Sequence, residues 1–281
     1  MRIVVTGSSG RIGKYVVREL VSAKHEVLGI DVLPTPAEVG RGMCVDLTDA
    51  GQVYGALGGF RAEAVIHMGA WANPGHVPDT RTYADNVQGT YNVFQACADL
   101  GIERVVSASS AQVYGFHEHA PDYVRVDESH PLKPINCYAL SKIAGESAAE
   151  YFSRNYGTTI LSFRFQGVRL PSEMDEQIGQ MARDPAGGRR LFWTRTDARD
   201  AAMACRLAVE VYRVDSGIYN ITGSRIALDT PVTELVRTHF GVDVEIREQD
   251  DWKSPMSCEH AREAFGYDPQ YPWTVKDRFP E

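Results

Sequence analysis

An α/β fold with a doubly wound parallel sheet and a small C-terminal lobe is predicted for this chain from three observations. Short apolar runs alternate with longer stretches of helical spacing through the first half of the sequence. These runs are apolar nearly throughout, as strands covered by helices on both faces require. The 281 residues are 43% hydrophobic and 23% charged, so the chain has enough apolar material for a large buried core.

The alternation gives an order of elements. The expected strands are 3–6, 26–30, 43–45, 64–67, 104–108, 159–163 and 217–221. The expected helices are 12–23, 50–57, 81–100, 136–156 and 197–211, and Gly157 is placed to end the fourth. After Phe165 the pattern breaks up around prolines and glycines (Pro171, Pro185, Gly187, Gly188), and no helix is assigned to 168–194.

Charge and cysteine usage exclude several classes of protein. The net charge of −8 disfavours a nucleic-acid binder, and the short basic cluster at Arg189, Arg190 and Arg195 is interpreted as a solvated loop. The five cysteines are widely spread and form no Cys-x-x-Cys pair, so neither a disulfide framework nor a zinc site is expected. The first strand begins at once, without a signal sequence, and no apolar run approaches membrane length, so we expect a soluble cytoplasmic protein.

A glycine-rich turn follows the first expected strand and leads directly into a helix. Gly7, Gly10 and Gly13 lack a Cβ atom, so the backbone there can turn tightly and approach a pyrophosphate. The helix that follows would present its N-terminal amides to the negative charge. This arrangement predicts a dinucleotide site in a Rossmann-type sheet.

A carboxylate at the end of the second strand indicates which dinucleotide binds. Asp31 can accept hydrogen bonds from both ribose hydroxyls of the adenosine and would repel a 2′-phosphate, which favours NAD over NADP. Asp46 and Leu47, after the third strand, are placed to meet the adenine. Residues 1–167 with 195–222 are therefore expected to form the NAD-binding domain, and 168–194 with 223–281 a small substrate-binding lobe.

The motifs resemble the extended short-chain dehydrogenase/reductase family, the NAD-dependent epimerases, dehydratases and sugar dehydrogenases. The resemblance runs to about Phe165, with looser similarity at 198–200 and 265–269. It rests on the glycine turn, Asp31, Asp46-Leu47, and the segments 65–70, 86–90, 109–115 and 138–142. The cofactor contacts that it implies are Gly7, Ser9, Gly10, Arg11, Ile12, Gly13, Asp31, Asp46, Leu47, Met68, Gly69, Ala70, Asn86, Ser109, Tyr138 and Lys142.

The expected catalytic residues are Ser110, Tyr138 and Lys142. Tyr138 and Lys142 are four residues apart, hence on one helix face, where the ammonium would lower the pKa of the phenol. Tyr138 could then accept the alcohol proton while hydride leaves for the nicotinamide, and Ser110 could hydrogen-bond the same oxygen. By resemblance, Lys142 also holds the nicotinamide ribose.

Other histidines are given structural roles. His67 ends an apolar strand and is interpreted as a buried, hydrogen-bonded side chain. His76, His117 and His119 lie on expected loops without ligand spacing, so no metal site is predicted. The resemblance also implies a homodimer built on helices 81–100 and 136–156, with Val87, Tyr91 and Phe94 as candidates for the interface or, equally, for contact with the sheet.

The substrate is less defined by the sequence. Dehydratases of the resembled family carry an Asp-Glu pair where this chain has Ala111-Gln112, and nucleotide-sugar epimerases an asparagine where it has Gly167. We therefore expect oxidation of a secondary alcohol of a sugar, sugar acid or related polyol. A sugar epimerase that retains its NAD is the alternative, and a non-catalytic NAD sensor a minor one. Substrate choice would depend on loops 71–79 and 116–131, and the candidate contacts are Trp71, Asn73, Ser110, Gln112, Gln166 and Arg195.

Overall fold

The computed structural model describes residues 1–34, 40–247 and 250–276, and its chain divides into two compact units. Unit 1 contains Met1–Ser109, Asn136–Phe163 and Ala202–Ile218. Unit 2 contains Ser110–Ile135, Arg164–Ala201 and Tyr219–Glu281. The domains expected from the sequence are defined by what they bind, and that assignment stays a prediction.

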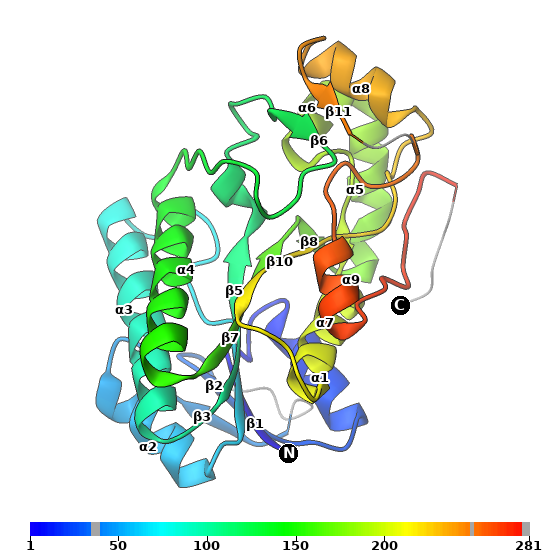
Figure 1. Cartoon of the computed structure of the whole chain (residues 1–281). Helices are drawn as coiled ribbons and strands as arrows, with labels where there is room; N and C mark the ends of the chain where they lie inside the picture. Colours follow the sequence, from blue (N-terminus) through cyan, green and yellow to red (C-terminus); the bar gives the residue numbers. More distant parts are fainter. Residues whose placement is uncertain (35–39, 248–249, 277–281) are drawn as a thin grey trace. The chain divides into compact units, whose positions relative to one another are not determined.

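The central sheet has seven strands in the order β10-β7-β5-β4-β1-β2-β3. Figure 1 shows β5 and β7 side by side in this sheet. β1 pairs in parallel with β2 and β4, and β3 and β5 continue the sheet in parallel on either side. The chain thus moves outward from β1 in both directions, which is the doubly wound arrangement expected from the sequence. The strands are β1 Arg2–Thr6, β2 Glu26–Asp31, β3 Gly42–Cys44, β4 Ala64–His67, β5 Arg104–Ser110, β7 Thr159–Phe165 and β10 Gly217–Ile221.

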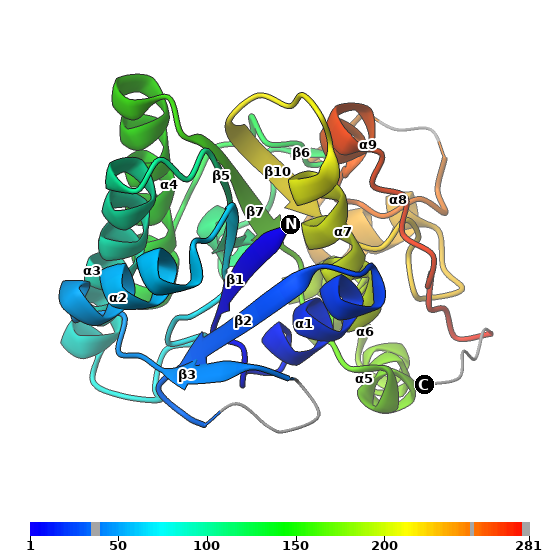
Figure 2. The same cartoon turned by 90° about the horizontal axis from the view of Figure 1, so that it is seen from below.

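Helices cover both faces of this sheet within unit 1. α2 (Ala50–Phe60), α3 (Asp79–Asp99) and α4 (Cys137–Tyr156) lie on one face and α1 (Gly13–Ser22) on the other (Figure 2). α7 (Ala198–Glu210) begins in unit 2 and reaches unit 1, where Arg206 pairs with Glu19 of α1 at 2.7 Å. No described helix is long and apolar enough to cross a bilayer.

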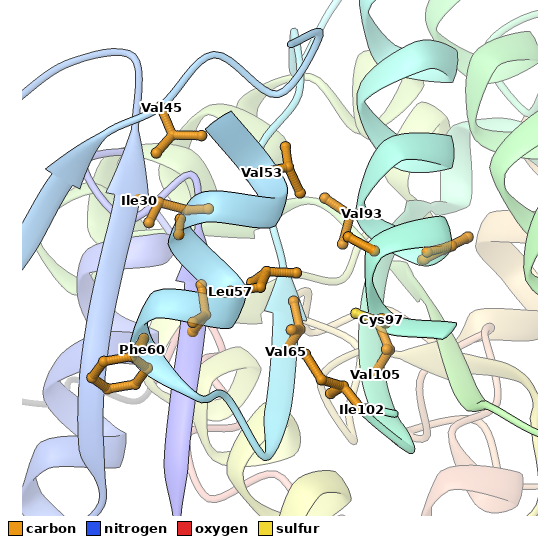
Figure 3. Packing of buried hydrophobic residues seen from close by; sticks show 14 of the residues in the cluster. Ile30, Val45, Val53, Leu57, Phe60, Val65, Val93, Cys97, Ile102 and Val105 are labelled. Atoms are coloured by element: carbon orange, nitrogen blue, oxygen red, sulfur yellow. The ribbon is translucent and has the colours of Figure 1, made fainter. Parts of the chain in front are cut away.

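A hydrophobic core of unit 1 lies between the sheet and the helices α2, α3 and α4 (Figure 3). Val4, Ile30 and Val65 from the strands meet Leu57 of α2 there, all with 2% exposure or less. Phe94 of α3 is also fully buried in this cluster, so of its two proposed positions it takes the one facing the sheet.

Unit 2 contains a helix where none was assigned. α5 (Pro171–Arg183) begins with a proline at its first turn, and the Glu173 side chain accepts a hydrogen bond from the Leu170 amide at 3.0 Å. Proline is tolerated at that position because its missing N–H has no intrahelical partner. Pro171 therefore starts a helix where its presence in the sequence predicted a break. The buried side chains Met174, Ile178 and Met181 follow helical spacing.

The remaining elements of unit 2 are short. They are β6 Tyr123–Val124, β8 Val168–Arg169, α6 Pro185–Gly188, β9 Thr196–Asp197, α8 Val232–His239, β11 Glu245–Ile246 and α9 Glu259–Phe265. β6 pairs with β11 and β8 with β9, both in parallel. Asp200 at the start of α7 fixes the position of the chain beyond α9. Its carboxylate accepts hydrogen bonds from the amides of Gln270 and Tyr271 at 2.8 and 3.1 Å.

Candidate active site

The glycine turn between β1 and α1 can form only because its glycines lack side chains. Gly7 has φ +65°, and a Cβ atom there would lie 2.7 Å from the Gly69 amide nitrogen. A Cβ atom on Gly13 would lie 2.0 Å from the Gly7 carbonyl oxygen. The Gly10 amide donates to that same carbonyl at 3.0 Å. The turn therefore exists only with these glycines, and it leaves backbone exposed where a pyrophosphate can approach, as an NAD site requires.

Asp31 lies at the end of β2, beside this turn. One carboxylate oxygen accepts a hydrogen bond from the Ser9 amide and the other from the Leu33 amide, both at 3.0 Å. These bonds fix the position of the carboxylate, which still has acceptor capacity for a ribose diol. The residues of the turn and Asp31 together fit NAD.

The loop after β4 is fixed by Thr6, a residue for which the sequence predicted no role. The Thr6 hydroxyl accepts hydrogen bonds from the amides of Met68 and Gly69 at 3.1 and 2.9 Å. It lies 2.8 Å from Nδ1 of His67, whose Nε2 lies 3.0 Å from the Thr90 hydroxyl. Burial and the nearby Lys142 lower the pKa of His67 to about 3, so this ring is neutral, buried and hydrogen-bonded, as expected.

Asn86 of α3 connects that loop to α4. Its side-chain oxygen accepts from the Trp71 amide at 2.8 Å, and its amide group donates to the Trp71 carbonyl and to the Ser141 hydroxyl. Ser141 in turn donates to the Tyr138 carbonyl at 2.7 Å. A cofactor contact was expected at Asn86, and the structure gives its side chain these positioning contacts.

Tyr138 and Lys142 lie on one face of α4, as their spacing predicts. Both are 7% exposed, and the Lys142 ammonium lies 5.6 Å from the centre of the Tyr138 ring. The ammonium donates to the Ala108 carbonyl of β5 at 2.7 Å. Burial lowers the pKa of Lys142 to about 8, and the carboxylate of Glu146 opposes part of this shift. At neutral pH the side chain is therefore mostly a buried cation held against a phenol.

Glu146 is the counter-charge to this lysine and was not anticipated. It lies one further turn along α4, is 8% exposed, and accepts a hydrogen bond from the Ser109 hydroxyl at 2.6 Å. A helical pattern of Tyr138, Lys142 and Glu146 at intervals of four is visible in the sequence, and a charged residue continuing that face could have been noticed.

The remaining unit 1 residues predicted to bind ligands differ in exposure. Leu47 packs so closely that a Cβ atom on Gly69 would lie 2.6 Å from its Cδ1. Trp71 is half-buried, with its indole nitrogen donating to Asp85 at 2.8 Å. Ile12 is also half-buried, and the exposed members are Arg11, Asp46, Ala70 and Asn73.

In unit 2, Ser110 is buried and is followed by a single 3-10 turn (Ala111–Tyr114), and its hydroxyl oxygen accepts from the Gln112 amide at 3.2 Å. Gln166 is 2% exposed and directly follows β7. The Thr196 hydroxyl donates to the Gln166 carbonyl at 2.6 Å, which places Gln166 beside the segment that carries Arg195. Arg195 is half-buried, so it is not the freely solvated residue that the basic cluster indicated.

The fold and the glycine turn define a dinucleotide-binding α/β protein. A family model described as the NAD dependent epimerase/dehydratase family matches residues 3–222. The chain therefore belongs to this family, and its cofactor is NAD. This confirms the resemblance to the extended short-chain dehydrogenases/reductases.

Named relatives include both dehydrogenases and epimerases. An L-arabinose 1-dehydrogenase (NAD(P)(+)) of Haloferax volcanii is 29% identical over 76% of this chain and 85% of its own length. A uronate dehydrogenase of Pseudomonas putida is 30% identical over 58% of this chain and 59% of its own length. A UDP-glucose 4-epimerase of Lactobacillus helveticus is 30% identical over 64% of this chain and 55% of its own length. The chain thus matches little more than half the length of the last two.

Solved structures show the same fold. A short-chain dehydrogenase/reductase superfamily protein of Agrobacterium tumefaciens with bound NAD has a TM-score of 0.76 at 24% identity, covering 98% of this chain and 94% of its own. UDP-glucose 4-epimerase of Thermotoga maritima has a TM-score of 0.72 at 22% identity, covering 98% of each chain.

Proposed function

We propose that the protein is a dehydrogenase that oxidises a secondary alcohol of a sugar, sugar acid or related polyol, with Tyr138 as the base. The observation that carries this proposal is the buried Lys142 ammonium, 5.6 Å from the centre of the Tyr138 ring on the same face of α4. A protein that only sensed NAD would need neither a base nor a cation to support it.

The proposed chemistry gives each of these side chains a role. The Lys142 ammonium stabilises negative charge on the Tyr138 oxygen, which lets this oxygen accept the alcohol proton. Ser110 donates a hydrogen bond to the same alcohol oxygen as charge develops there. NAD, when bound, supplies the acceptor for the hydride that leaves the alcohol carbon. The glycine turn and Asp31 hold the cofactor, and Asn86 and Ser141 position the helix that carries the base.

Relatives of both kinds leave epimerisation as the competing outcome of one experiment. The protein is purified without added nucleotide, and NADH absorbance is followed with neutral aldoses, uronates, aldonates, sugar phosphates and nucleotide sugars. NADH that accumulates with a sugar or sugar acid, and that Tyr138→Phe abolishes, supports the dehydrogenase. Retained NAD with no net NADH, together with isomerised sugar in the product, would replace it with the epimerase.

We also propose a homodimer formed through α3 and α4. These helices lie side by side (Figure 1), and three exposed tyrosines gather near Phe152: Tyr91, Tyr151 and Tyr156 are 43%, 41% and 48% exposed. Clustered exposed aromatic side chains are typical of protein interfaces. Light scattering should give twice the chain mass for the native protein and the single chain mass for Tyr91→Glu. A monomeric native protein at micromolar concentration would contradict the proposal.

A further inference from the structure

Three buried nitrogen donors in unit 2 have no acceptor among the described residues. They are Nε2 of Gln166, Nε of Arg195 and Nδ2 of Asn220. Buried donors in folded proteins are nearly always hydrogen-bonded, so each such atom needs an explanation. One explanation is a bound ligand whose oxygen atoms accept these hydrogen bonds. This explanation is appropriate where several donors lie together.

The Gln166 and Arg195 side chains belong to one small cluster. Thr196, next to Arg195, donates to the Gln166 carbonyl at 2.6 Å. Gly167, next to Gln166, has φ +49°, and a Cβ atom there would lie 3.5 Å from Cδ of Arg195. The aliphatic part of Arg195 therefore lies against the bare backbone of Gly167.

This cluster is positively charged. Arg195 donates from Nη1 to the carbonyl of its own neighbour Thr194 at 2.8 Å, and none of the described carboxylates forms an ion pair with it. Burial and the nearby Arg169 lower the pKa of Arg195 to about 10. Arg199, by contrast, is paired with Asp197 at 2.9 Å. The Arg195 guanidinium is partly buried, lies near that of Arg169 and forms no ion pair with a described carboxylate. Such a group favours the binding of an external anion.

The cluster lies at the end of the sheet that carries Ser110. β7 and β5 are hydrogen-bonded neighbours, and the Thr159 amide at the start of β7 donates to the Glu103 carbonyl just before β5. Counting the same number of residues along both strands from that hydrogen bond places Gln166 opposite Ser110 and Ala111. Ligands of parallel sheets bind beyond this end of the strands, so one small molecule can reach both Ser110 and Gln166.

We propose that Arg195, with the Gln166 amide and the charge of Arg169, binds an anionic group of the sugar substrate. This inference rests on the proposed function and narrows its substrate to a sugar that carries a carboxylate or a phosphate. Arginine suits either group, because its fork donates two parallel hydrogen bonds to paired oxygens.

The kinetic test compares acidic and neutral sugars in the NAD-loaded enzyme. We expect NADH from D-glucuronate, D-galacturonate or glucose 6-phosphate at a kcat/KM at least tenfold above that for glucose and galactose. Arg195→Gln should raise KM for the acidic substrate at least tenfold while KM for NAD and kcat/KM for the neutral sugar stay within twofold. Arg183→Gln removes an exposed positive charge of α5 in the same unit and should leave all these values unchanged.

Calorimetric binding gives a readout that does not depend on turnover. D-Glucuronate, glucose 6-phosphate and inorganic phosphate are titrated into the protein loaded with NADH, which cannot oxidise a sugar, and the one that binds identifies a carboxylate or a phosphate. Binding should be lost in Arg195→Gln, partly kept in Arg195→Lys and fully kept in Arg183→Gln, with thermal unfolding checking that each variant is folded.

The outcomes separate the two proposals. Anion binding that depends on Arg195, without NADH from any sugar, would refute the dehydrogenase and support the anion site. NADH from neutral sugars as efficient as from acidic ones, equal losses for both in Arg195→Gln, or no binding of any of the three anions would refute the anion site.

Discussion

The Lys142 ammonium lies 5.6 Å from the centre of the Tyr138 ring and is fixed there by a 2.7 Å hydrogen bond to the Ala108 carbonyl. The pair is rigid on both sides, because Asn86 and Ser141 hold the first turn of α4 while Ala108 belongs to β5. The proposed base and its supporting cation are thus held in place by the protein itself, which is the arrangement that catalysis by electrostatic stabilisation favours.

Replacing Tyr138 by phenylalanine should remove the base and leave the site otherwise intact. We expect kcat/KM to fall about 10²–10⁴-fold, since this is the usual contribution of a positioned general base. NAD affinity, measured by calorimetry, should change less than threefold. Tyr83→Phe on α3 removes a hydroxyl from a tyrosine that is 38% exposed and serves as the matched control. Full activity in Tyr138→Phe would contradict the assigned role.

The depressed pKa of Lys142 makes stability depend on pH in a defined direction. The folded-state value is about 8 and the ordinary value is 10.5, so the unfolded chain binds more protons at this position between those two pH values. This group's contribution therefore destabilises the fold at pH 7 and is relieved as the pH rises above 8. Lys142→Met removes that dependence while keeping a side chain of similar length.

Urea unfolding of the NAD-free protein measures this effect. The advantage in unfolding free energy of Lys142→Met over the native protein should shrink by about 2 kcal/mol between pH 7 and pH 10, because groups that do not contact Lys142 titrate equally in both. If the unfolding free energies of the two proteins changed in parallel with pH, burial of the Lys142 ammonium would not destabilise the fold.

The sequence predicted the sheet well because its strands carry a simple signal. Ala64–His67 and Gly217–Ile221 were bounded correctly, since each is an apolar run between turn residues. The helix at Pro171–Arg183 was missed because Pro171 was interpreted as a breaker, although proline in a first turn starts helices. The two-residue strands β6, β8, β9 and β11 carry no periodicity, because partners distant in the sequence define them.

The candidate site was predictable where the separation of residues along the sequence fixes their relative positions. Tyr138 and Lys142 share a helix, and the glycine turn is a single short segment, so both could be located from the sequence. The roles of Thr6 and Glu146 depend on which residues the fold brings beside them, Gly69 and Ser109, and no local pattern encodes these neighbours. The same holds for the missing acceptor at Arg195, which only a three-dimensional arrangement can reveal.

Asp31 should determine the preference for NAD over NADP. Its carboxylate is held by the Ser9 and Leu33 amides, so Asp31→Asn keeps the shape of the side chain and removes the charge that repels a 2′-phosphate. We expect the ratio of kcat/KM for NAD to that for NADP to fall about tenfold or more. Asp243→Asn, an exposed carboxylate of unit 2, gives the same change in net charge and should leave the ratio unchanged. An unaltered ratio in Asp31→Asn would place the adenosine ribose elsewhere.

Gly13→Ala should disrupt the turn that is predicted to bind the pyrophosphate. The added methyl group would lie 2.0 Å from the Gly7 carbonyl oxygen, which is backbone and can move only if the turn opens. We expect a loss of about 2 kcal/mol or more in unfolding free energy, because overpacking at a rigid backbone contact is costly, together with weaker NAD binding. Gly55→Ala is the matched control, since no atom lies within 4 Å of its added methyl group on α2, and it should stabilise the protein by about 0.5–1 kcal/mol through helix propensity. If Gly13→Ala bound NAD as tightly as the native protein and unfolded at the same urea concentration, the close packing of the turn would not be what makes it a dinucleotide site.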